Sequence, residues 1–352
     1  MSNLVKLCLV LVLGGLVVAC GGGSSSSGGG GSNNTPDPTS NNDESAGDVT
    51  QDEPEILPPT AQPRALQGAL FLPVSTAVQW HYDNGDVVSF GPAKQVAGET
   101  IYPMQHSLPG LVTEEYFYTK DNVIHFGGLF GNLIELPLMG QLAGEFTFNT
   151  LWPVYNEATG RGSVYSCPGK FNSVPAVPGY ENFPVPLFCF SAALNRKQVT
   201  VPQLGEVPAV GLDLNIGIPT LDGLIARLWL SPGIGIVERE VGVGGEFSQK
   251  STLQRVEGLT APVIFAFGRG SGLSQNPQQL RWFGEVITSN QWQASIGYAT
   301  KETDWLQVEY DATGSWRASL VGDELPWGLH AALVTLENNG QTRDIAVSVL
   351  VQ

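Results

Sequence analysis

The stretch Glu115-Tyr116-Phe117-Tyr118-Thr119-Lys120-Asp121-Asn122-Val123-Ile124-His125-Phe126 decides the fold class of this chain. Two short runs of aromatic and β-branched residues, 115–118 and 123–126, flank the polar triplet 120–122. Such runs are enriched in strands, and an Asp-Asn turn between them is typical of an antiparallel hairpin. The stretch therefore predicts two paired strands.

The same pattern recurs along the chain. Val87-Val88-Ser89-Phe90 and Glu145-Phe146-Thr147-Phe148 are further strand-like runs, and Asp83-Asn84-Gly85-Asp86 is a second turn sequence. The best helical candidate, 221–230, leads into Trp229-Leu230-Ser231-Pro232-Gly233, where a strand that ends in a turn fits better. We therefore predict an all-β protein.

The region 64–250 is predicted to be an antiparallel β domain. This region resembles a group of uncharacterised bacterial lipoproteins. The resemblance rests on Phe71-Leu72-Pro73-Val74, Trp80-His81-Tyr82-Asp83-Asn84-Gly85, Val199-Thr200-Val201-Pro202 and 228–237. In that group a W-x-Y strand begins a curved antiparallel sheet, and a WLaPGvGiV strand and turn end it. The resemblance implies this architecture and an envelope location. The proline-rich, cysteine-bearing stretch 152–198 is an insertion relative to the group.

From residue 258 to 352 the rhythm of short strands predicts a separate β-sandwich. This region resembles the BACON type of immunoglobulin-like domain. The resemblance rests on Asp304-Trp305-Leu306-Gln307-Val308, Gly314, Leu320, 325–331 and 345–351. Trp327 and His330 depart from the family pattern. BACON-like domains are commonly attached to surface proteins that handle glycans, so the resemblance implies either carbohydrate binding or a spacer.

The start of the chain resembles a bacterial lipoprotein signal peptide. Lys6 precedes an apolar run that ends in the lipobox-like sequence Val17-Val18-Ala19-Cys20. The run is too short to cross a hydrocarbon layer of about 30 Å. The resemblance implies a signal peptide over 1–19, lipidation of Cys20 and, because Gly21 is not Asp, an outer-membrane location. The Gly, Ser, Asn and acidic composition of 20–63 predicts a disordered tether.

Charge narrows the range of partners. The chain has 33 acidic and 17 basic residues, for a net charge of -16. Nucleic acid and anionic lipid both need a basic footprint, so we expect neither as a partner. The expected membrane contact is through the lipid anchor, and the candidate partners are a polysaccharide or an envelope protein.

Two cysteines remain once Cys8 in the signal and the lipidated Cys20 are set aside. An even pair in an exported protein predicts a disulfide between Cys167 and Cys189. The segment that this bond would enclose is rich in proline, which indicates an irregular excursion that needs a covalent staple.

Tryptophan is concentrated in the last quarter of the chain. Alternation along the predicted strands places Trp292 and Trp316 in the core. It places Trp305 on the polar face, while Trp327 lies in a turn and Trp282 is ambiguous. Exposed aromatic rings can stack on sugars, so Trp305, Trp327 and Trp282 are the candidate ligand-binding residues. A structural cover at the sandwich edge is the alternative.

No common catalytic motif is present, and the four histidines show no metal-ligand spacing. The acidic residues fall in turns such as Asp83 and Asp86, or on polar strand faces. We therefore expect no enzyme activity, no cofactor and no metal site. The preferred function is a surface binding module. The alternatives are a carrier of lipid or another hydrophobic ligand, suggested by the apolar stretch 129–139, and a structural spacer.

Overall fold

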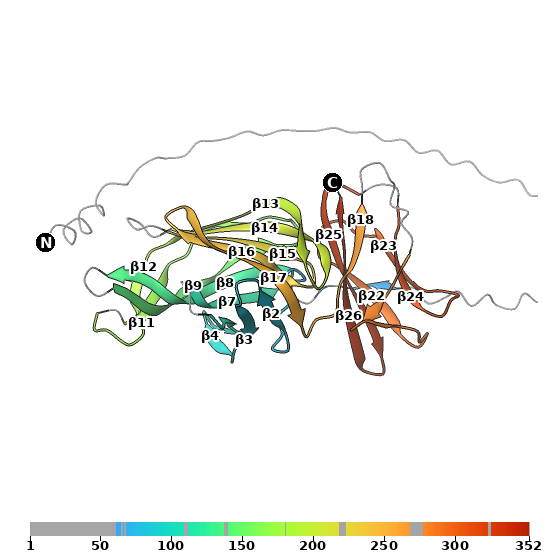
Figure 1. Ribbon diagram of the computed structural model, residues 1–352, viewed down its shortest axis with the longest axis horizontal. Helices are drawn as coiled ribbons and strands as arrows, with labels where there is room; N and C mark the ends of the chain where they lie inside the picture. Colours follow the sequence, from blue (N-terminus) through green and yellow to red (C-terminus); the bar gives the residue numbers. More distant parts are fainter. Residues whose placement is uncertain are drawn as a thin grey trace, which may run out of the picture. The chain divides into compact units, whose positions relative to one another are not determined.

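The computed structural model describes residues 61–64, 66, 68–108, 112–136, 140–179, 181–217, 223–267, 277–322 and 325–351. Every regular element in these ranges is a β-strand, which confirms the all-β prediction (Figure 1). Among them, no helix is long and apolar enough to cross a membrane. The expected signal peptide, Cys20 and all of the tether up to residue 60 lie outside the described residues.

The larger part of the fold is one fourteen-stranded sheet. All the pairings within it are antiparallel, as predicted for this region. In spatial order its strands are β10 (Val164–Ser166), β13 (Phe188–Val201), β14 (Gly205–Gly217), β15 (Leu224–Ser231), β16 (Gly235–Val243), β17 (Glu246–Glu257), β2 (Gln79–Tyr82), β3 (Val87–Phe90), β6 (Met104–His106), β7 (Val112–Lys120), β8 (Val123–Leu136), β9 (Gly140–Asn156), β11 (Gly169–Ser173) and β12 (Phe183–Val185).

The sheet curves until its two ends meet. β10 and β11 are separated only by Cys167 and Pro168, yet β10 pairs with β13 at one end of the sheet and β11 pairs with β9 at the other. The Cys167 N–H donates to Leu187 O (3.1 Å), and the Asn149 N–H donates to Pro168 O (2.9 Å). A two-residue link therefore ties the ends of the sheet together.

The predicted disulfide lies at this link. Cys167 and Cys189 are bonded, with Cα atoms 5.9 Å apart, which confirms the pairing. Both side chains are buried. The bond fastens the link to β13. The inserted stretch 152–198 is therefore more than a surface excursion, because it supplies strands that close the sheet.

The curved sheet forms two layers around one hydrophobic core. Figure 1 shows β13–β17 above β2, β3 and β7–β9. Trp80, Trp152, Phe117 and Phe71 are among the largest fully buried side chains of this core. The small hairpin of β4 (Lys94–Val96) and β5 (Glu99–Ile101) adds a satellite cluster with Tyr116.

The sequence that decides the fold class forms the predicted hairpin. β7 and β8 are joined by Asp121 and Asn122, whose φ angles of 50° and 61° are both left-handed. Two such residues make the type I′ turn that matches the twist of paired strands, and Asp and Asn tolerate this conformation. Local turn chemistry therefore sets the register at this point.

The C-terminal part consists of smaller sheets around a second core. One sheet has the order β1 (Gln62–Pro63), β22 (Gln293–Tyr298), β25 (Gly328–Asn338), β26 (Gln341–Val351), β18 (Val263–Phe267). The facing sheet has the order β19 (Gln278–Gln279), β24 (Trp316–Leu320), β23 (Leu306–Tyr310), and a two-stranded hairpin joins β20 (Arg281–Trp282) to β21 (Glu285–Val286). Core side chains from both sheets form one cluster.

β1 comes from the end of the expected tether. It pairs in parallel with β22, and the Arg64 N–H donates to Ile296 O (2.7 Å). The Ala61 N–H donates to Val308 O (2.9 Å) of β23. The segment 61–64 therefore belongs to the C-terminal sheets and connects the two of them at one edge.

Loss of the disulfide should weaken the closure of the large sheet. We expect the double variant Cys167→Ser/Cys189→Ser to lose about 3 kcal/mol in free energy of unfolding, the chain-entropy value for a loop of 22 residues. Urea denaturation measures this loss, and fully reduced wild-type protein should match the variant. A variant as stable as the oxidised protein would contradict the role of this bond.

Candidate functional site

Trp305 is buried, so the prediction that it is an exposed ring is wrong. Only 2% of its surface is accessible, and its ring packs near Tyr298 (5.8 Å between centroids) and His330 (6.5 Å). The alternation argument failed because β23 begins only at Leu306. The preceding Asp304 has a left-handed φ of 62°, which reorients the chain before the strand starts.

Trp292 and Trp316 are core residues, as predicted. Both are buried, and the Trp316 indole N–H donates to Ser289 O at 2.9 Å. Trp316 lies in β24, and Trp292 directly precedes β22 with the alternation of buried and exposed side chains continuing through it, so alternation gives the correct face for both.

Trp327 is exposed, in agreement with its prediction. It has 67% of its surface accessible and precedes β25 in a short connection. The carbonyl of Pro326 lies 2.7 Å from Nε2 of the buried His330, so the backbone beside the tryptophan is anchored to the core.

Trp282 belongs to a stack of aromatic and cationic groups. The guanidinium of Arg343 lies 5.0 Å from the Trp282 ring and 4.6 Å from the Trp292 ring, so it is held by two cation–π contacts. Phe283 meets Trp282 edge-on at 4.7 Å. Sequence reasoning did not select Phe283 or Arg343. We call Trp282 and Phe283, at the tip of the β20–β21 hairpin, the aromatic hairpin.

Two features of Phe283 are unfavourable: the exposure of its ring and the conformation of its backbone. It is 54% exposed, and its φ of 48° is left-handed, as is that of Gly284 at 84°. This two-residue connection favours Asn or Gly at its first position, and a bulky residue there loses roughly 1–2 kcal/mol. A large apolar side chain held exposed on a strained backbone is typical of a functional surface.

The aromatic hairpin and Trp327 lie at opposite ends of one strand pair. Arg343, which contacts Trp282, pairs with Leu336, whereas Trp327 precedes Gly328 at the start of β25. Eight residues separate Gly328 from Leu336, which is roughly 26 Å at the usual rise of a strand. The three predicted tryptophans therefore do not form one binding platform.

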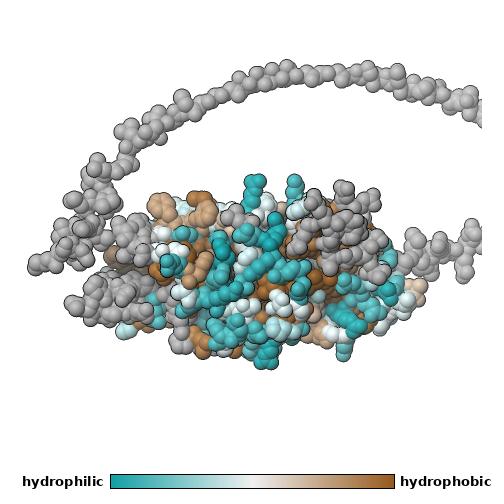
Figure 2. All heavy atoms as spheres, turned by 45° about the horizontal axis from the view of Figure 1, so that its top comes forward, coloured by the Kyte–Doolittle hydropathy of each residue, from teal (hydrophilic) through white to brown (hydrophobic). Residues whose placement is uncertain are grey.

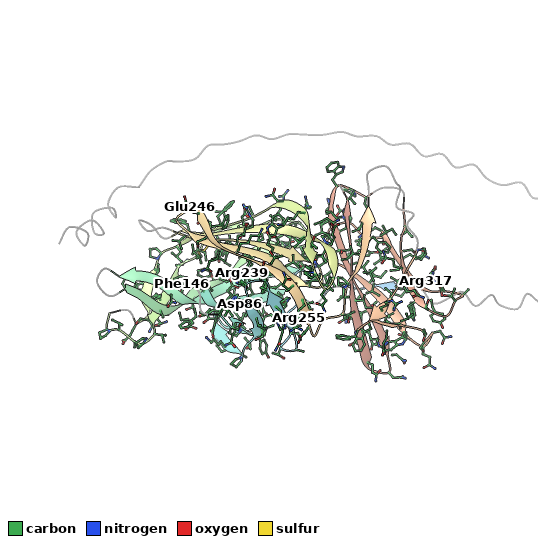
Figure 3. All side chains as sticks on the ribbon, in the orientation of Figure 1. Asp86, Phe146, Arg239, Glu246, Arg255 and Arg317 are labelled. Carbon is green, nitrogen blue, oxygen red and sulfur yellow. A yellow bond between two sulfur atoms is a disulfide. The ribbon has the colours of Figure 1, made fainter. Side chains whose placement is uncertain are left out.

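The large sheet contains a buried charged cluster that the sequence analysis missed. His106 Nδ1 lies 2.6 Å from Asp86 Oδ2, and Arg239 Nη2 donates to Glu115 Oε1 at 3.0 Å. Arg239 comes from β16 in one layer, and His106 and Glu115 come from β6 and β7 in the other. Figure 3 shows Arg239 and Asp86 close together in this view. The cluster therefore links the two layers through the core.

The members of this cluster stabilise one another's charges. Burial opposes ionisation of Glu115, but the charge of Arg239 and a hydrogen bond to His106 outweigh it and lower the pKa of Glu115 to about 2. Burial lowers the pKa of His106, yet its hydrogen bonds to Asp86 and Glu115 prevail and raise that pKa overall. Asp86 lies in a turn, as the sequence predicts, and its side chain is buried there and paired with His106.

Both ring nitrogens of His106 are occupied. Nε2 lies 2.7 Å from Arg239 Nη1 and 3.3 Å from Glu115 Oε2, while Nδ1 faces Asp86. The Ser107 hydroxyl donates to Asp86 Oδ1 at 3.2 Å rather than to the ring. This arrangement joins the layers and leaves neither nitrogen directed at a nucleophile among the described residues.

Two hollows bear on ligand binding. One, of about 260 Å³, lies at the edge of the C-terminal sheets and is lined by Tyr298, Asp304, Gln307 and aliphatic residues that include Ala61. The other lies between the layers of the large sheet, beside Glu115 and Phe126, and measures about 20 Å³. That volume suits a water molecule and not an alkyl chain.

The apolar stretch 129–139 is only partly described. Leu129 is a core residue, and Phe130 packs on the satellite cluster with Tyr116. Leu138 and Met139 lie outside the described residues. Within the described ranges, no group of three or more His, Cys, Asp or Glu side chains could hold a metal ion.

Comparisons with known proteins give no family. No protein-family model matches the chain, and no curated protein matches it. Among solved structures, one match is an endo-fucoidan hydrolase from glycoside hydrolase family 107, at 12% identity and a TM-score of 0.19. The match covers 83% of this chain and 44% of that chain. A similarity at this level carries no argument about fold or activity.

The buried position of Trp305 predicts a large loss of stability on truncation. We expect Trp305→Ala to lower the free energy of unfolding by about 3–5 kcal/mol, because a buried indole leaves a cavity. Trp327→Ala is the matched control and should change stability by less than about 0.5 kcal/mol. Chemical denaturation of both variants distinguishes the two environments, and equal stabilities would contradict the assigned burial.

Glu157 predicts a specific pH dependence. Its buried carboxylate accepts the backbone N–H groups of Leu70 (2.9 Å) and Phe71 (2.6 Å). Burial raises its pKa to about 8, although those two hydrogen bonds lower it. The folded protein thus binds this proton more tightly than the unfolded chain. The stability that protonation supplies is complete below pH 4.5 and is lost as pH rises through about 8.

We expect Glu157→Gln to remove this dependence. The wild-type free energy of unfolding should fall by up to about 1.4 kcal/mol per pH unit between pH 5 and 8 relative to the variant. The variant loses one acceptor, so it should be less stable at pH 5, and the difference should shrink as pH rises. Urea denaturation at several pH values tests this. A difference that stays constant or widens would refute it.

Proposed function

We propose that this protein is a non-enzymatic, lipid-anchored protein of the cell envelope that binds carbohydrate through the aromatic hairpin. The observation that supports the proposal is Phe283: an aromatic side chain that is 54% exposed at a left-handed backbone position, against Trp282. The lipid anchor rests on Cys20 and the sequence around it.

Carbohydrate suits this surface better than other ligand classes. The apolar faces of sugar rings pack on exposed aromatic rings, and two adjacent rings at a tip can hold consecutive sugars. The stack of Trp282 on Arg343 and Trp292 restricts the tryptophan, which reduces the entropy lost on binding. The guanidinium of Arg343 can also donate hydrogen bonds to sugar hydroxyls at the edge of the stack.

The alternatives have less support. A lipid carrier needs an interior cavity for an alkyl chain, and the hollow between the layers of the large sheet measures about 20 Å³. A pure spacer gives no reason for an exposed phenylalanine on a strained backbone. An envelope protein as the partner stays an outcome of the experiment below.

The aromatic hairpin allows a variant in which stability and binding change in opposite directions. Phe283→Asn places a residue that tolerates the left-handed conformation and removes the exposed ring. We expect it to keep or raise the melting temperature while carbohydrate affinity falls at least tenfold. Trp282→Ala should weaken binding similarly. Phe247→Asn, at another exposed phenylalanine that contacts an arginine, is the matched control and should bind as wild type.

The measurement is a polysaccharide and glycan-array screen of the full chain carrying Cys20→Ser, followed by titration of the variants against the best ligand. Binding that is lost in Phe283→Asn and kept in Phe247→Asn supports the proposal. No glycan bound by the parent protein, or equal binding by both variants, would overturn it and direct attention to a protein partner.

A further inference from the structure

We infer that one end of the large sheet carries a membrane-docking surface, an apolar strip that inserts into the interface of a zwitterionic bilayer. The inference rests on the lipid anchor of the proposed function, because that anchor would hold the chain beside a membrane. It concerns the outer face of β10 and β13–β17 and is separate from the aromatic hairpin.

Two large aromatic rings lie on the outer face of β13. Leu187 and Cys189 belong to the hydrophobic core, and side chains alternate along a strand, so the residues between and after them point outward. These residues are Phe188, which is 69% exposed, and Phe190, which is 47% exposed. The two rings are therefore about 7 Å apart along one strand and face solvent.

One row of paired residues crosses the outer face from β10 to β17. Its members, in spatial order, are Val164, Phe190, Asn215, Ile225, Gly242 and Phe247. Residues that pair directly lie on the same face of a sheet. At its ends, Val164 is 79% exposed and Phe247 is 41% exposed. At the usual spacing of strands the row is about 24 Å long. We call this row, together with Phe188, the apolar strip.

The apolar strip lies where the strands begin and end. β13 begins at Phe188, and β17 begins at Glu246, next to Phe247. Hydrophobic side chains gather at the left end of the face that Figure 2 shows, the end at which Figure 3 labels Glu246. A strip at the strand ends can meet a flat partner without the rest of the sheet lying between them.

The next row toward the middle of the sheet is charged, and its net charge is zero. Its members are Asp213, Arg227, Glu240 and Lys250, two acids and two bases. The Arg227 Nε–H donates to Asp213 Oδ1 at 2.6 Å, and the same guanidinium lies 5.1 Å from the Phe247 ring. The apolar strip therefore has a polar, neutral border that head groups of a zwitterionic lipid can meet.

The dimensions of the apolar strip suit a lipid interface better than a protein partner. A strip about 24 Å long and 7 Å wide covers roughly 170 Å². A stable protein interface buries roughly 800 Å² on each partner, several times this area. Interfacial insertion needs an apolar face buried only about 5–10 Å deep at the boundary of head groups and acyl chains. A shallow strip with a charged row behind it has this form.

The lipid anchor would make a weak contact with lipid sufficient. Residues 21–60 can span up to about 140 Å when extended, whereas a compact protein of this size is roughly 50 Å across. The strip can therefore reach the membrane that holds Cys20. The anchor also makes docking intramolecular, with an effective concentration in roughly the millimolar range. The net charge of -16 opposes anionic lipid, so a zwitterionic lipid is the class to test.

The test uses the mature chain, residues 20–352 with Cys20→Ser, which keeps every described residue and carries no acyl chain. Sedimentation with sucrose-loaded phosphatidylcholine vesicles measures its partition coefficient. We expect binding that Phe188→Asn lowers at least threefold and Phe188→Asn/Phe190→Asn abolishes, with little change in melting temperature because both rings are exposed. Phe283→Asn, the same change at an exposed phenylalanine of the aromatic hairpin, is the matched control and should bind as the parent chain does.

Two further conditions test the neutral character of the surface. Sodium chloride should leave binding to phosphatidylcholine unchanged, because the strip and its charged border have no net charge. Vesicles that also contain phosphatidylglycerol should bind the chain more weakly. Salt-sensitive binding, or tighter binding to the anionic vesicles, would contradict the inference.

The outcomes separate this surface from the proposed function. Vesicle binding that falls in Phe188→Asn and persists in Phe283→Asn supports the surface. No binding by the parent chain, or an equal loss in both variants, would overturn it. Self-association of the parent chain that Phe188→Asn abolishes, without vesicle binding, would also overturn it and assign the strip to a second copy. Glycan binding is measured without vesicles, and lipidation of Cys20 by the mass of the unmutated mature protein, so failure of either proposal is seen separately.

Discussion

The closure of the large sheet through Cys167 and Pro168 is the constraint on which the rest of the fold depends. Two residues separate β10 from β11, so the strands at both ends of the sheet must come within reach of one short link. The sheet therefore curves into two layers, and the side chains between them form one core. The disulfide to Cys189 fastens this link to β13.

Closure also explains why charged groups can lie inside the protein. Arg239 reaches from one layer to Glu115 and His106 in the other, and each group has an oppositely charged or hydrogen-bonding partner. A buried ion pair is costly when one partner is removed, so the cluster favours a single arrangement of the layers over shifted ones. Glu157 accepts hydrogen bonds from backbone N–H groups instead, and burial raises its pKa because these two bonds only partly offset it.

Sequence patterns predicted the features of the fold that depend on neighbouring residues or on residue type alone. The β7–β8 hairpin, the core positions of Trp292 and Trp316, and the disulfide all follow from alternation, turn residues or cysteine pairing. Contacts between distant segments could not be predicted in this way. The partners of Arg239 lie more than a hundred residues away, and β1 pairs with a strand far along the chain. Trp305 was misassigned because one left-handed residue, Asp304, precedes its strand.

The proposed carbohydrate site depends on a backbone conformation that the sequence does not display. Phe283 lies in a left-handed turn and Trp327 in the connection before β25, so strand alternation does not decide the exposure of either ring. The most direct measurement is an NMR titration that follows the indole N–H signals of the eight tryptophans as a bound glycan is added. The account predicts a shift at Trp282 and none at Trp305 and Trp316. Shifts confined to the buried indoles, or none despite binding, would contradict it.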